Sequence, residues 1–361
     1  HGERDAARGL YHDVLGLVLA APFDEGRLAA ALAEVVDRHP LLRTSVTFDG
    51  HGEPLQLVHR RARAPLSVAD LSGLPEADRP GAISLWLGEE TSRPFDSGSA
   101  PLLRTQVHLE GDGRWRLSLA FHHAILDGWS VAALFTELLS VYSALLFGRE
   151  LPPPARPAFR YRDFVAAERR LLASDAARET WVRRLAGAPF ARLPRRARRG
   201  PTGTGACEVP LPPGLHSRLA ELARVAGVPV KSVLLAAHVR VLSVLSGELD
   251  VVTGLVSNAR PEVEGGERVL GLFLNTLPFR TSLAGGTWVD LVRQTFRAEL
   301  DLLPDRGYPM AGIREALGGG ALFEVAFNYV HYHVYRDLEA IPGLEVLGRS
   351  VFERTDFALV A

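Results

Sequence analysis

The sequence has little sulfur, few lysines and no long apolar run. Its 361 residues include one cysteine, one methionine and 41 basic residues, nearly all of them arginine. The single cysteine, Cys207, excludes an internal disulfide and provides no Cys-x-x-Cys pair for zinc or redox chemistry. No apolar stretch approaches the roughly 20 residues of a membrane span, and no signal peptide is visible. We therefore expect a cytoplasmic protein with no membrane partner.

The composition also limits the classes of protein. The chain is 47% hydrophobic and 23% charged with a net charge of −1, which fits neither a disordered chain nor a nucleic-acid-binding protein. Phosphate-binding loops, a Gly-x-Ser-x-Gly turn and paired carboxylates in a supporting context are absent from the sequence. A chain of 361 residues is long for one hydrophobic core, so we expect two domains.

The most informative segment is residues 121–129, which read Phe-His-His-Ala-Ile-Leu-Asp-Gly-Trp. The preceding residues 115–121 alternate in polarity like a strand, and residues 130–142 carry apolar side chains at helical spacing. The segment is therefore predicted to be a turn from a strand into a helix. Such a turn presents a histidine at the end of a sheet and points free helix N–H groups into the same space, where both can act on a carbonyl group.

Hydrophobic periodicity predicts a mixture of helices and strands on both sides of this turn. Helices are expected to alternate with a largely antiparallel sheet in the first half, and a proline-rich crossing at 148–157 leads to a second half of the same kind. Strands are expected at 15–19, 102–109, 115–121, 251–256 and 273–280, together with a hairpin within 41–58. Further helices are expected to begin at Asp24 and to span 161–186, 213–226, 230–245 and 288–303.

Residues 122–128 resemble the HHxxxDG signature of condensation domains of nonribosomal peptide synthetases, within the chloramphenicol acetyltransferase-like superfamily. Other blocks of that family occur in the expected order. Residues 38–44 are similar to its RHxxLRT block, residues 161–164 to Tyr-x-Asp-Phe, residues 271–280 to G-x-F-x-N-T-x-P-x-R, and residues 327–329 to Phe-Asn-Tyr. The resemblance spans nearly the whole chain.

The resemblance implies an α/β (α+β) fold with two chloramphenicol acetyltransferase-like subdomains. Each is expected to hold a mixed, largely antiparallel sheet with flanking helices, and the two are expected to form a V with a tunnel between them. The N-terminal subdomain is placed at 1–165, an interdomain helix and linker at 166–200, and the C-terminal subdomain at 201–361. The family's first block, Ser-x-x-Gln, is missing from the start of this sequence. Members of the family usually continue for several more strands beyond the point where this sequence ends at Ala361. We therefore expect the chain to be incomplete at both ends.

The activity that the resemblance implies is amide formation by an acyltransferase. The amine of an aminoacyl acceptor would attack the thioester of an acyl or peptidyl donor. Both substrates would arrive on the 4′-phosphopantetheine arms of donor and acceptor peptidyl carrier proteins, beside neighbouring synthetase domains and without a dissociable cofactor. Two alternatives remain: acyl transfer to a soluble amine or alcohol, and a condensation-like domain that recruits a partner without catalysis.

Within the turn, His123 is the candidate base or amine-positioning group. Adjacent strand residues point to opposite faces, so His122 is expected to pack behind the site. The same argument disfavours a metal site made from His122, His123 and Asp127, because ligands must converge on the ion. Gly128 is expected to offer a backbone N–H to a developing oxyanion while leaving room for the thioester.

The remaining site residues are expected to support the turn or to line the tunnel. The resemblance implies that Asp127 forms a structural salt bridge with an arginine, for which Arg280 is the first choice and Arg43 the alternative. The other role open to Asp127 is direct proton transfer. Trp129, Ser257 and Asn275 are weaker candidates for the substrate tunnel. For Trp129 a wall position is favoured over a catalytic role. For Ser257 and Asn275 the alternative is hydrogen bonding within loops.

Overall fold

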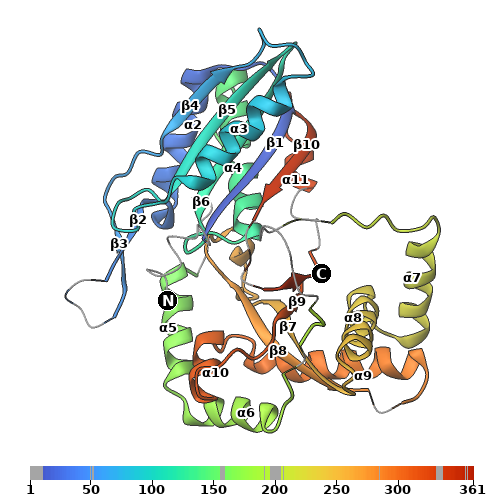
Figure 1. The fold of residues 1–361 in the computed structure, drawn as a ribbon. Coiled ribbons are helices and arrows are strands. Elements are labelled where there is room, and N and C mark those ends of the chain that lie inside the picture. Colours follow the sequence, from blue (N-terminus) through green and yellow to red (C-terminus); the bar gives the residue numbers. More distant parts are fainter. Residues whose placement is uncertain are drawn as a thin grey trace. The chain divides into compact units, whose positions relative to one another are not determined.

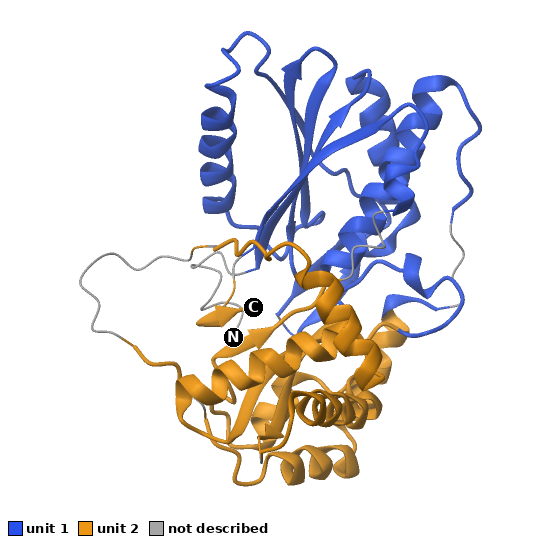
Figure 2. Ribbon diagram, turned by 90° about the vertical axis from the view of Figure 1, so that its right-hand side faces the viewer, with its two compact units in different colours: residues 1–161, 261–272, 331–354 blue, residues 162–260, 273–330, 355–361 orange. Residues whose placement is uncertain are grey.

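The computed structural model of the chain describes residues 11–361 except 49, 51–52, 155–158, 191, 196–204, 206, 284, 331–335, 354 and 356. The chain divides into two compact units, which are coloured separately in Figure 2. Unit 1 comprises residues 1–161, 261–272 and 331–354, and unit 2 comprises residues 162–260, 273–330 and 355–361.

These units differ from the predicted subdomains because they are not continuous in sequence. The first boundary lies close to the predicted one, but residues 261–272 and 331–354 belong to unit 1 although they come from the predicted C-terminal subdomain. The reason is long-range pairing: residues 345–352 form a strand beside residues 12–20, and the backbone at Gly271 bonds to the start of the helix at 128. Local periodicity identifies a strand but not its partner.

Unit 1 is built around a five-stranded sheet in the order β10-β1-β6-β5-β4 (Figure 1). Its neighbouring strands are antiparallel except for the parallel pair β4 and β5, so the sheet is largely antiparallel as predicted. The strands are β1 (His12–Ala20), β4 (Leu66–Asp70), β5 (Leu103–Gly111), β6 (Arg114–His122) and β10 (Glu345–Phe352), and β2 (Thr44–Thr47) pairs separately with β3 (Leu55–Val58). The helices are α2 (Glu25–Arg38), α3 (Arg79–Ser92), α4 (Gly128–Phe147) and α11 (Arg336–Glu339).

The alternation of side chains along the strands gives this sheet two different faces. On one face, leucines of β1 and β6 are buried in a single core with apolar residues of α2 and α4. On the other face, His12, Arg104 and His108 contact α3. Because β6 lies in the middle of the sheet, its end is held by strands on both sides.

Helix α4 corrects the expectation that no apolar stretch is as long as a membrane span. It has 20 residues, and its mean hydropathy of 1.7 makes it long and apolar enough to cross a membrane. However, 61% of this apolar stretch is buried, and its buried side chains belong to the core of unit 1. A core helix has this composition because protein neighbours cover it. Among the described residues, α7 (Leu215–Ala226) and α8 (Val230–Ser246) of unit 2 are long and apolar enough only as a pair, which is bent by 99°.

Unit 2 contains a four-stranded sheet in the order β11-β9-β7-β8. Strand β7 is antiparallel to β8 and parallel to β9, and β9 is parallel to β11, so this sheet is mixed. Side chains of α6, α8, α9 and α10 are buried against it. Its strands are β7 (Asp250–Asn258), β8 (Leu274–Ser282), β9 (Val325–Phe327) and β11 (Leu359–Val360). The helices that follow the proline-rich segment 148–157 are α5 (Tyr161–Leu172), α6 (Asp175–Leu185), α7 (Leu215–Ala226), α8 (Val230–Ser246), α9 (Trp288–Leu302) and α10 (Met310–Ala316).

The predicted helix over 161–186 is two helices, α5 and α6. The side chain of Ser174 accepts a hydrogen bond from the N–H of Ala177 and so caps a new helix. Helix α3 and strand β4 were not predicted at all. Helix α3 contains Pro80, Gly81 and Gly88, which are poor helix formers, so only its packing on the sheet reveals it.

Candidate functional site

Residues 123–127 form the predicted turn between β6 and α4, and backbone hydrogen bonds fix both of its ends. The N–H of His123 donates to the carbonyl of Tyr11 at 2.8 Å, which extends the β1–β6 ladder by one residue. The N–H of Asp127 donates to the carbonyl of Gly271 at 3.0 Å. The turn is therefore anchored within unit 1 to β1 and to residues 261–272.

The imidazole of His123 is held in one tautomer. Its side chain is 36% exposed, and its Nδ1 lies 2.9 Å from the carbonyl oxygen of Leu126. A carbonyl oxygen only accepts hydrogen bonds, so Nδ1 must carry the proton, and Nε2 of the neutral ring keeps its lone pair. No residue in the described part of the chain bonds to Nε2. The ring can therefore accept a proton from a substrate at Nε2.

A carboxylate from β1 approaches the same ring. Oδ2 of Asp13 lies 3.3 Å from Nδ1 of His123, and the Asp13 side chain is buried. Asp13 pairs with Phe121 in the ladder, which puts it on the sheet face that also carries His123. Asp13 is not among the predicted site residues. Its signal in the sequence is the polar start, Tyr-His-Asp, of an otherwise apolar strand.

His122 has a different environment from its neighbour. It pairs with His12 in the ladder and stacks on Tyr11 with a centroid separation of 5.9 Å. Its Nδ1 accepts a hydrogen bond from the N–H of Ala124 at 3.1 Å. Burial lowers the pKa of His122 to about 4, with smaller contributions from His123 and His12, so its ring is neutral at pH 7. These contacts support the packing role that was predicted for it.

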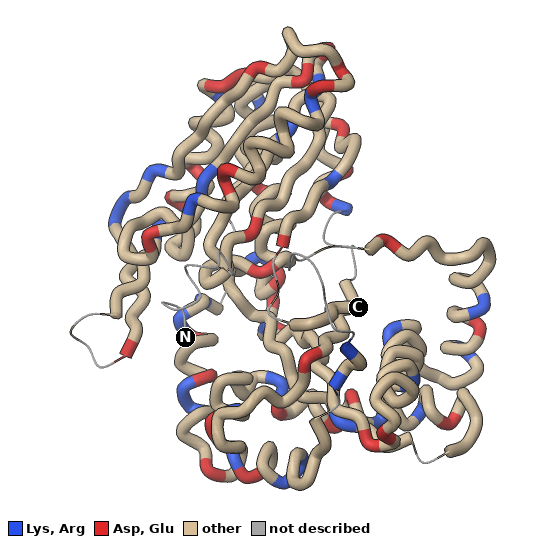
Figure 3. Tube along the Cα trace, in the orientation of Figure 1, with Lys and Arg blue, Asp and Glu red and all other residues tan. Residues whose placement is uncertain are grey.

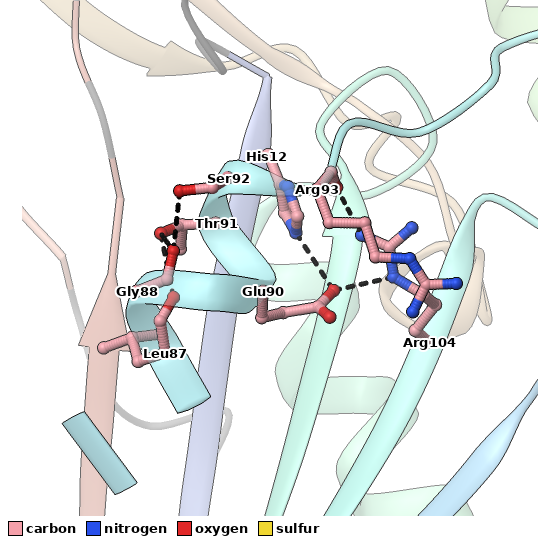
Figure 4. A network of polar contacts seen from close by, with 8 residues as sticks. All are labelled: His12, Leu87, Gly88, Glu90, Thr91, Ser92, Arg93 and Arg104. Carbon is pink, nitrogen blue, oxygen red and sulfur yellow. Dashed lines mark hydrogen bonds and ion pairs between the residues drawn. The ribbon is translucent and has the colours of Figure 1, made fainter. Parts of the chain in front are cut away.

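His12 belongs to a buried polar network between β1, β5 and α3 (Figure 4). Its Nε2 lies 3.4 Å from Oε1 of Glu90, and Nε of Arg104 donates to the same oxygen at 2.7 Å. Burial opposes ionisation of Glu90, but interactions with His12 and Arg104 outweigh it and lower the pKa of this carboxyl. Phe95 lies under the Arg104 guanidinium and contacts the rings of His12 and His122 edge-on. The network thus holds the start of β1 behind the turn.

The start of α4 is tied to residues 261–272 by side chains of its first turn. Asp127 is fully buried and caps the helix, because its side chain accepts from the N–H of Ser130 at 2.7 Å. The Ser130 hydroxyl donates to the carbonyl of Gly271 at 2.8 Å and accepts from its N–H at 3.0 Å. Nε1 of Trp129 donates to the carbonyl of Glu267 at 3.0 Å. These bonds fix the position at which Gly128 enters the helix.

Gly128 is the first residue of α4 and leaves open space beside it. No described residue accepts a hydrogen bond from its N–H. A Cβ built on Gly128 would meet no atom within 4 Å. An N–H that no described residue occupies is what the predicted interaction with an oxyanion requires, and the open Cβ position leaves space beside the Cα atom.

The arginine predicted to pair with Asp127 has other partners in unit 2. Nη2 of Arg280 lies 2.7 Å from Oδ2 of Asp250, and its Nη1 donates to the carbonyls of Arg184 and Ala186 at 3.1 and 2.9 Å. Asp250 begins β7, the antiparallel neighbour of β8, which places it diagonally across from Arg280. Within unit 2, a cross-strand neighbour and two carbonyls thus hold this guanidinium, and its pairing with Asp127 stays a prediction.

Arg43, the alternative partner, is also engaged elsewhere. Its Nε donates to the carbonyl of Val36 at 3.2 Å near the end of α2, and its Nη1 donates to the carbonyls of His59 and Arg60. A guanidinium at the carbonyl end of a helix is stabilised by the helix dipole. Both arginines therefore bind carbonyls that the fold brings close, which sequence spacing does not reveal.

The two tunnel candidates in unit 2 lie opposite each other in the β7–β8 ladder. The side chain of Asn275 donates to the carbonyls of Arg306 and Tyr308 at 3.0 and 2.8 Å. Its partner in the ladder is Ser257. The contacts of Asn275 correspond to loop hydrogen bonding, the alternative given for it, and tunnel lining by Asn275, Ser257 or Trp129 stays a prediction.

A further carboxylate near this turn is that of Glu353, which interacts electrostatically with Asp13 and His123. In the part of the chain that the structure describes, no group of three His, Cys, Asp or Glu side chains is placed to hold a metal ion. Figure 3 shows acidic and basic residues interspersed along the traced parts of both units. The turn itself offers an imidazole with a free Nε2, a buried carboxylate and a helix N–H.

Comparison with known proteins gives matches along nearly the whole chain. A sequence model described as Condensation domain matches residues 5–359. The AMB antimetabolite synthetase AmbE of Pseudomonas aeruginosa is 40% identical over 326 residues, which is 90% of this chain and 15% of that protein. The chain thus spans a small part of the length of this curated relative.

Solved structures share the fold. The first condensation domain of the calcium-dependent antibiotic synthetase, solved with a substrate analogue, has a TM-score of 0.78 at 24% identity over 92% of this chain and 78% of that one. The SgcC5 protein from Streptomyces globisporus, solved with a naphthyl ethanediol and sucrose, has a TM-score of 0.70 at 26% identity over 89% and 74%.

Proposed function

The chain belongs to the Condensation domain family, and we propose on that basis that it transfers an acyl or peptidyl group from a carrier-bound thioester to the amine of a carrier-bound aminoacyl acceptor. The observation that carries the proposal is the hydrogen bond from Nδ1 of His123 to the carbonyl of Leu126. This bond leaves the unprotonated Nε2 free to contact the amine, beside a helix start that offers its own N–H.

The reaction places modest demands on the base. An α-amino group has a pKa of about 7.7–8.0, so much of it is already neutral near pH 8. The amine nitrogen bonds to the thioester carbon while the carbonyl oxygen gains negative charge, which the N–H of Gly128 can stabilise. Nε2 of His123 accepts the proton from that nitrogen, the C–S bond breaks, and the proton passes to the departing thiolate. General base catalysis supplies roughly 10²–10⁴-fold, and alignment of two tethered reactants can supply more.

The partners in this proposal are a donor and an acceptor peptidyl carrier protein, together with neighbouring synthetase domains, in the cytoplasm. The 4′-phosphopantetheine arms belong to the carriers, and no separate cofactor takes part. The match to AmbE supports this setting, because AmbE is a synthetase of which this chain covers 15%. His122 and Asp127 act in the proposal as supports of the turn, through the packing and helix cap that the structure gives them.

A second candidate is acyl transfer to a soluble amine or alcohol. It is favoured by one observation, that the SgcC5 structure at 26% identity was solved with a small diol. A soluble acceptor would use the same Nε2 and the same N–H. The two functions differ in whether the acceptor must be attached to a carrier.

Product formation measured by intact-protein mass spectrometry tests both candidates. The protein is mixed with a loaded donor carrier and one of three acceptors: an aminoacyl carrier, the same amino acid as a free amide, or a hydroxyacyl carrier. The control is an aminoacyl carrier whose amine is acetylated and cannot attack. We expect transfer to the aminoacyl carrier above all others. Preferred transfer to the free amide would support the second candidate, and carrier binding without transfer to any acceptor would contradict both.

A further inference from the structure

The carboxylate of Asp13 is buried beside the imidazole of His123. Its Oδ2 lies 3.3 Å from Nδ1 of the imidazole, and its side chain is 6% exposed. A carboxylate with so little contact with water needs hydrogen-bond donors or cations nearby. Nδ1 already carries a proton, because it is bonded to the carbonyl of Leu126. The carboxylate therefore faces the protonated side of the ring and leaves Nε2 unobstructed.

The sheet, and not a flexible loop, holds these two side chains together. Asp13 pairs with Phe121 in the β1–β6 ladder, and the N–H of His123 bonds to the carbonyl of Tyr11 one residue further along. On the opposite face of β1, His12 lies against Glu90 of α3 (Figure 4). Both strands are thus fixed where they carry the carboxylate and the imidazole.

Other titratable groups near His123 come from three neighbouring elements. Glu353 follows β10 and interacts electrostatically with both Asp13 and His123. His122 ends β6 and is neutral at pH 7, and Asp127 precedes α4 with its side chain bonded to the N–H of Ser130. Among the residues that the structure describes, Asp13 supplies the carboxylate within ion-pair distance of Nδ1.

We propose that Asp13 is a positioning residue for His123 in the amide-forming reaction. Its carboxylate fixes the ring from the Nδ1 side and stabilises the imidazolium that forms when Nε2 takes the proton of the amine. The proton then passes to the departing thiolate and the ring becomes neutral again, while Asp13 stays ionised throughout. This inference rests on the proposed function. It adds Asp13, which lies outside the HHxxxDG block, to the residues that take part in the proposed reaction.

The test compares wild type with Asp13→Asn in the pH profile of single-turnover amide formation. Asparagine keeps the size of the side chain and one of its oxygens but removes the charge. Without the carboxylate the charged ring is less favoured, so the acid limb of the profile should move to lower pH. The plateau rate should fall at least about tenfold, within the range that base catalysis supplies.

A second measurement needs no substrate. The ¹⁵N resonances of the imidazole rings report tautomer and pKa directly, and His123→Ala identifies the His123 signals among the 12 histidines. We expect the Nδ1–H tautomer in wild type and a lower pKa of His123 in Asp13→Asn. Because this reading is independent of turnover, it separates a failure of the inference from a failure of the proposed function.

Two further variants serve as controls. Asp24→Asn removes a carboxylate that caps α2 through the N–H of Arg27, beyond the far end of β1. The nine residues of β1 span about 30 Å, so this variant should change neither the pH profile of amide formation nor the ¹⁵N resonances of His123. Glu353→Gln removes the other nearby carboxylate and should shift the pKa of His123 by less than Asp13→Asn does.

An unchanged His123 pKa together with an unchanged pH profile in folded Asp13→Asn would overturn the inference. A lowered His123 pKa without product formation by wild type would overturn the proposed function and, with it, the catalytic part of the inference. A lowered pKa with the expected loss of rate would support both.

Discussion

The turn after β6 in unit 1 and the strands β7 and β8 in unit 2 both carry polar residues from recognisable family blocks, but the fold uses them differently. In the turn, no described residue bonds to Nε2 of His123 or accepts from the N–H of Gly128. In unit 2, Arg280 is bound to Asp250 and two carbonyls, and the amide of Asn275 is bound to two carbonyls of a loop. A polar motif residue is available for chemistry only when the fold leaves part of it unpaired.

The difference follows from the cost of burying polar groups. An unpaired polar group away from water costs on the order of 1–3 kcal/mol, so most such groups find partners during folding. The two histidines of the motif show the same contrast at one strand end. His122 is packed among rings and its Nδ1 accepts from a backbone N–H, whereas His123 remains 36% exposed.

Among the variants that keep His123, the largest change is expected from Asp127→Ala. The variant loses the cap of α4, which costs about 0.5–2 kcal/mol, and frees the turn that positions His123 and Gly128. Amide formation per folded molecule should fall on the order of 10²-fold or more. Asp127→Asn is the matched control, because asparagine caps helices as well as aspartate does. Equal rates of amide formation by Asp127→Ala and Asp127→Asn would show that the helix cap does not hold the turn. Denaturant unfolding gives the free energy of unfolding of each variant.

A smaller loss is expected from Gly128→Ala. The added methyl meets no atom within 4 Å, and alanine is the better helix former by about 1 kcal/mol, so the free energy of unfolding should stay the same or rise. Single-turnover amide formation should nevertheless fall about tenfold or more, because the methyl occupies the space beside the N–H that the thioester needs. Gly88→Ala in α3, where the added Cβ also meets no atom within 4 Å, should gain stability without losing rate. A fully active Gly128→Ala would remove Gly128 from the site.

The smallest effect on rate is expected from Arg280→Ala. The ion pair with Asp250 is partly exposed, so its loss should cost about 0.2–1 kcal/mol, measured as the coupling in a double-mutant cycle with Asp250→Ala. The rate of amide formation per folded molecule should stay at the wild-type value. A loss of rate as large as that of Gly128→Ala would break the comparison between the two units and would support the predicted role of Arg280 as a partner of Asp127.

Local sequence predicted most of the elements because hydrophobic periodicity is a local property. The strand, turn and helix around His123 lie where they were expected, and the helix over 161–186 was wrong only in missing the cap at Ser174. Long-range pairing could not be predicted in the same way. Asp13 reaches His123 because β1 and β6 are neighbours in the sheet, and Arg280 finds Asp250 across β7 and β8. Neither partner is indicated by its spacing from the motif.

The most direct test of the site is the single-turnover rate of amide formation by folded His123→Ala, relative to wild type at equal concentration of folded protein. If Nε2 of His123 takes the proton of the amine, the variant should lose about 10²–10⁴-fold in rate. Denaturant unfolding gives the free energy of unfolding of both proteins, because the substitution also removes the ring beside the buried carboxylate of Asp13. Equal rates in the two proteins would contradict the assignment of His123 as the group that handles this proton.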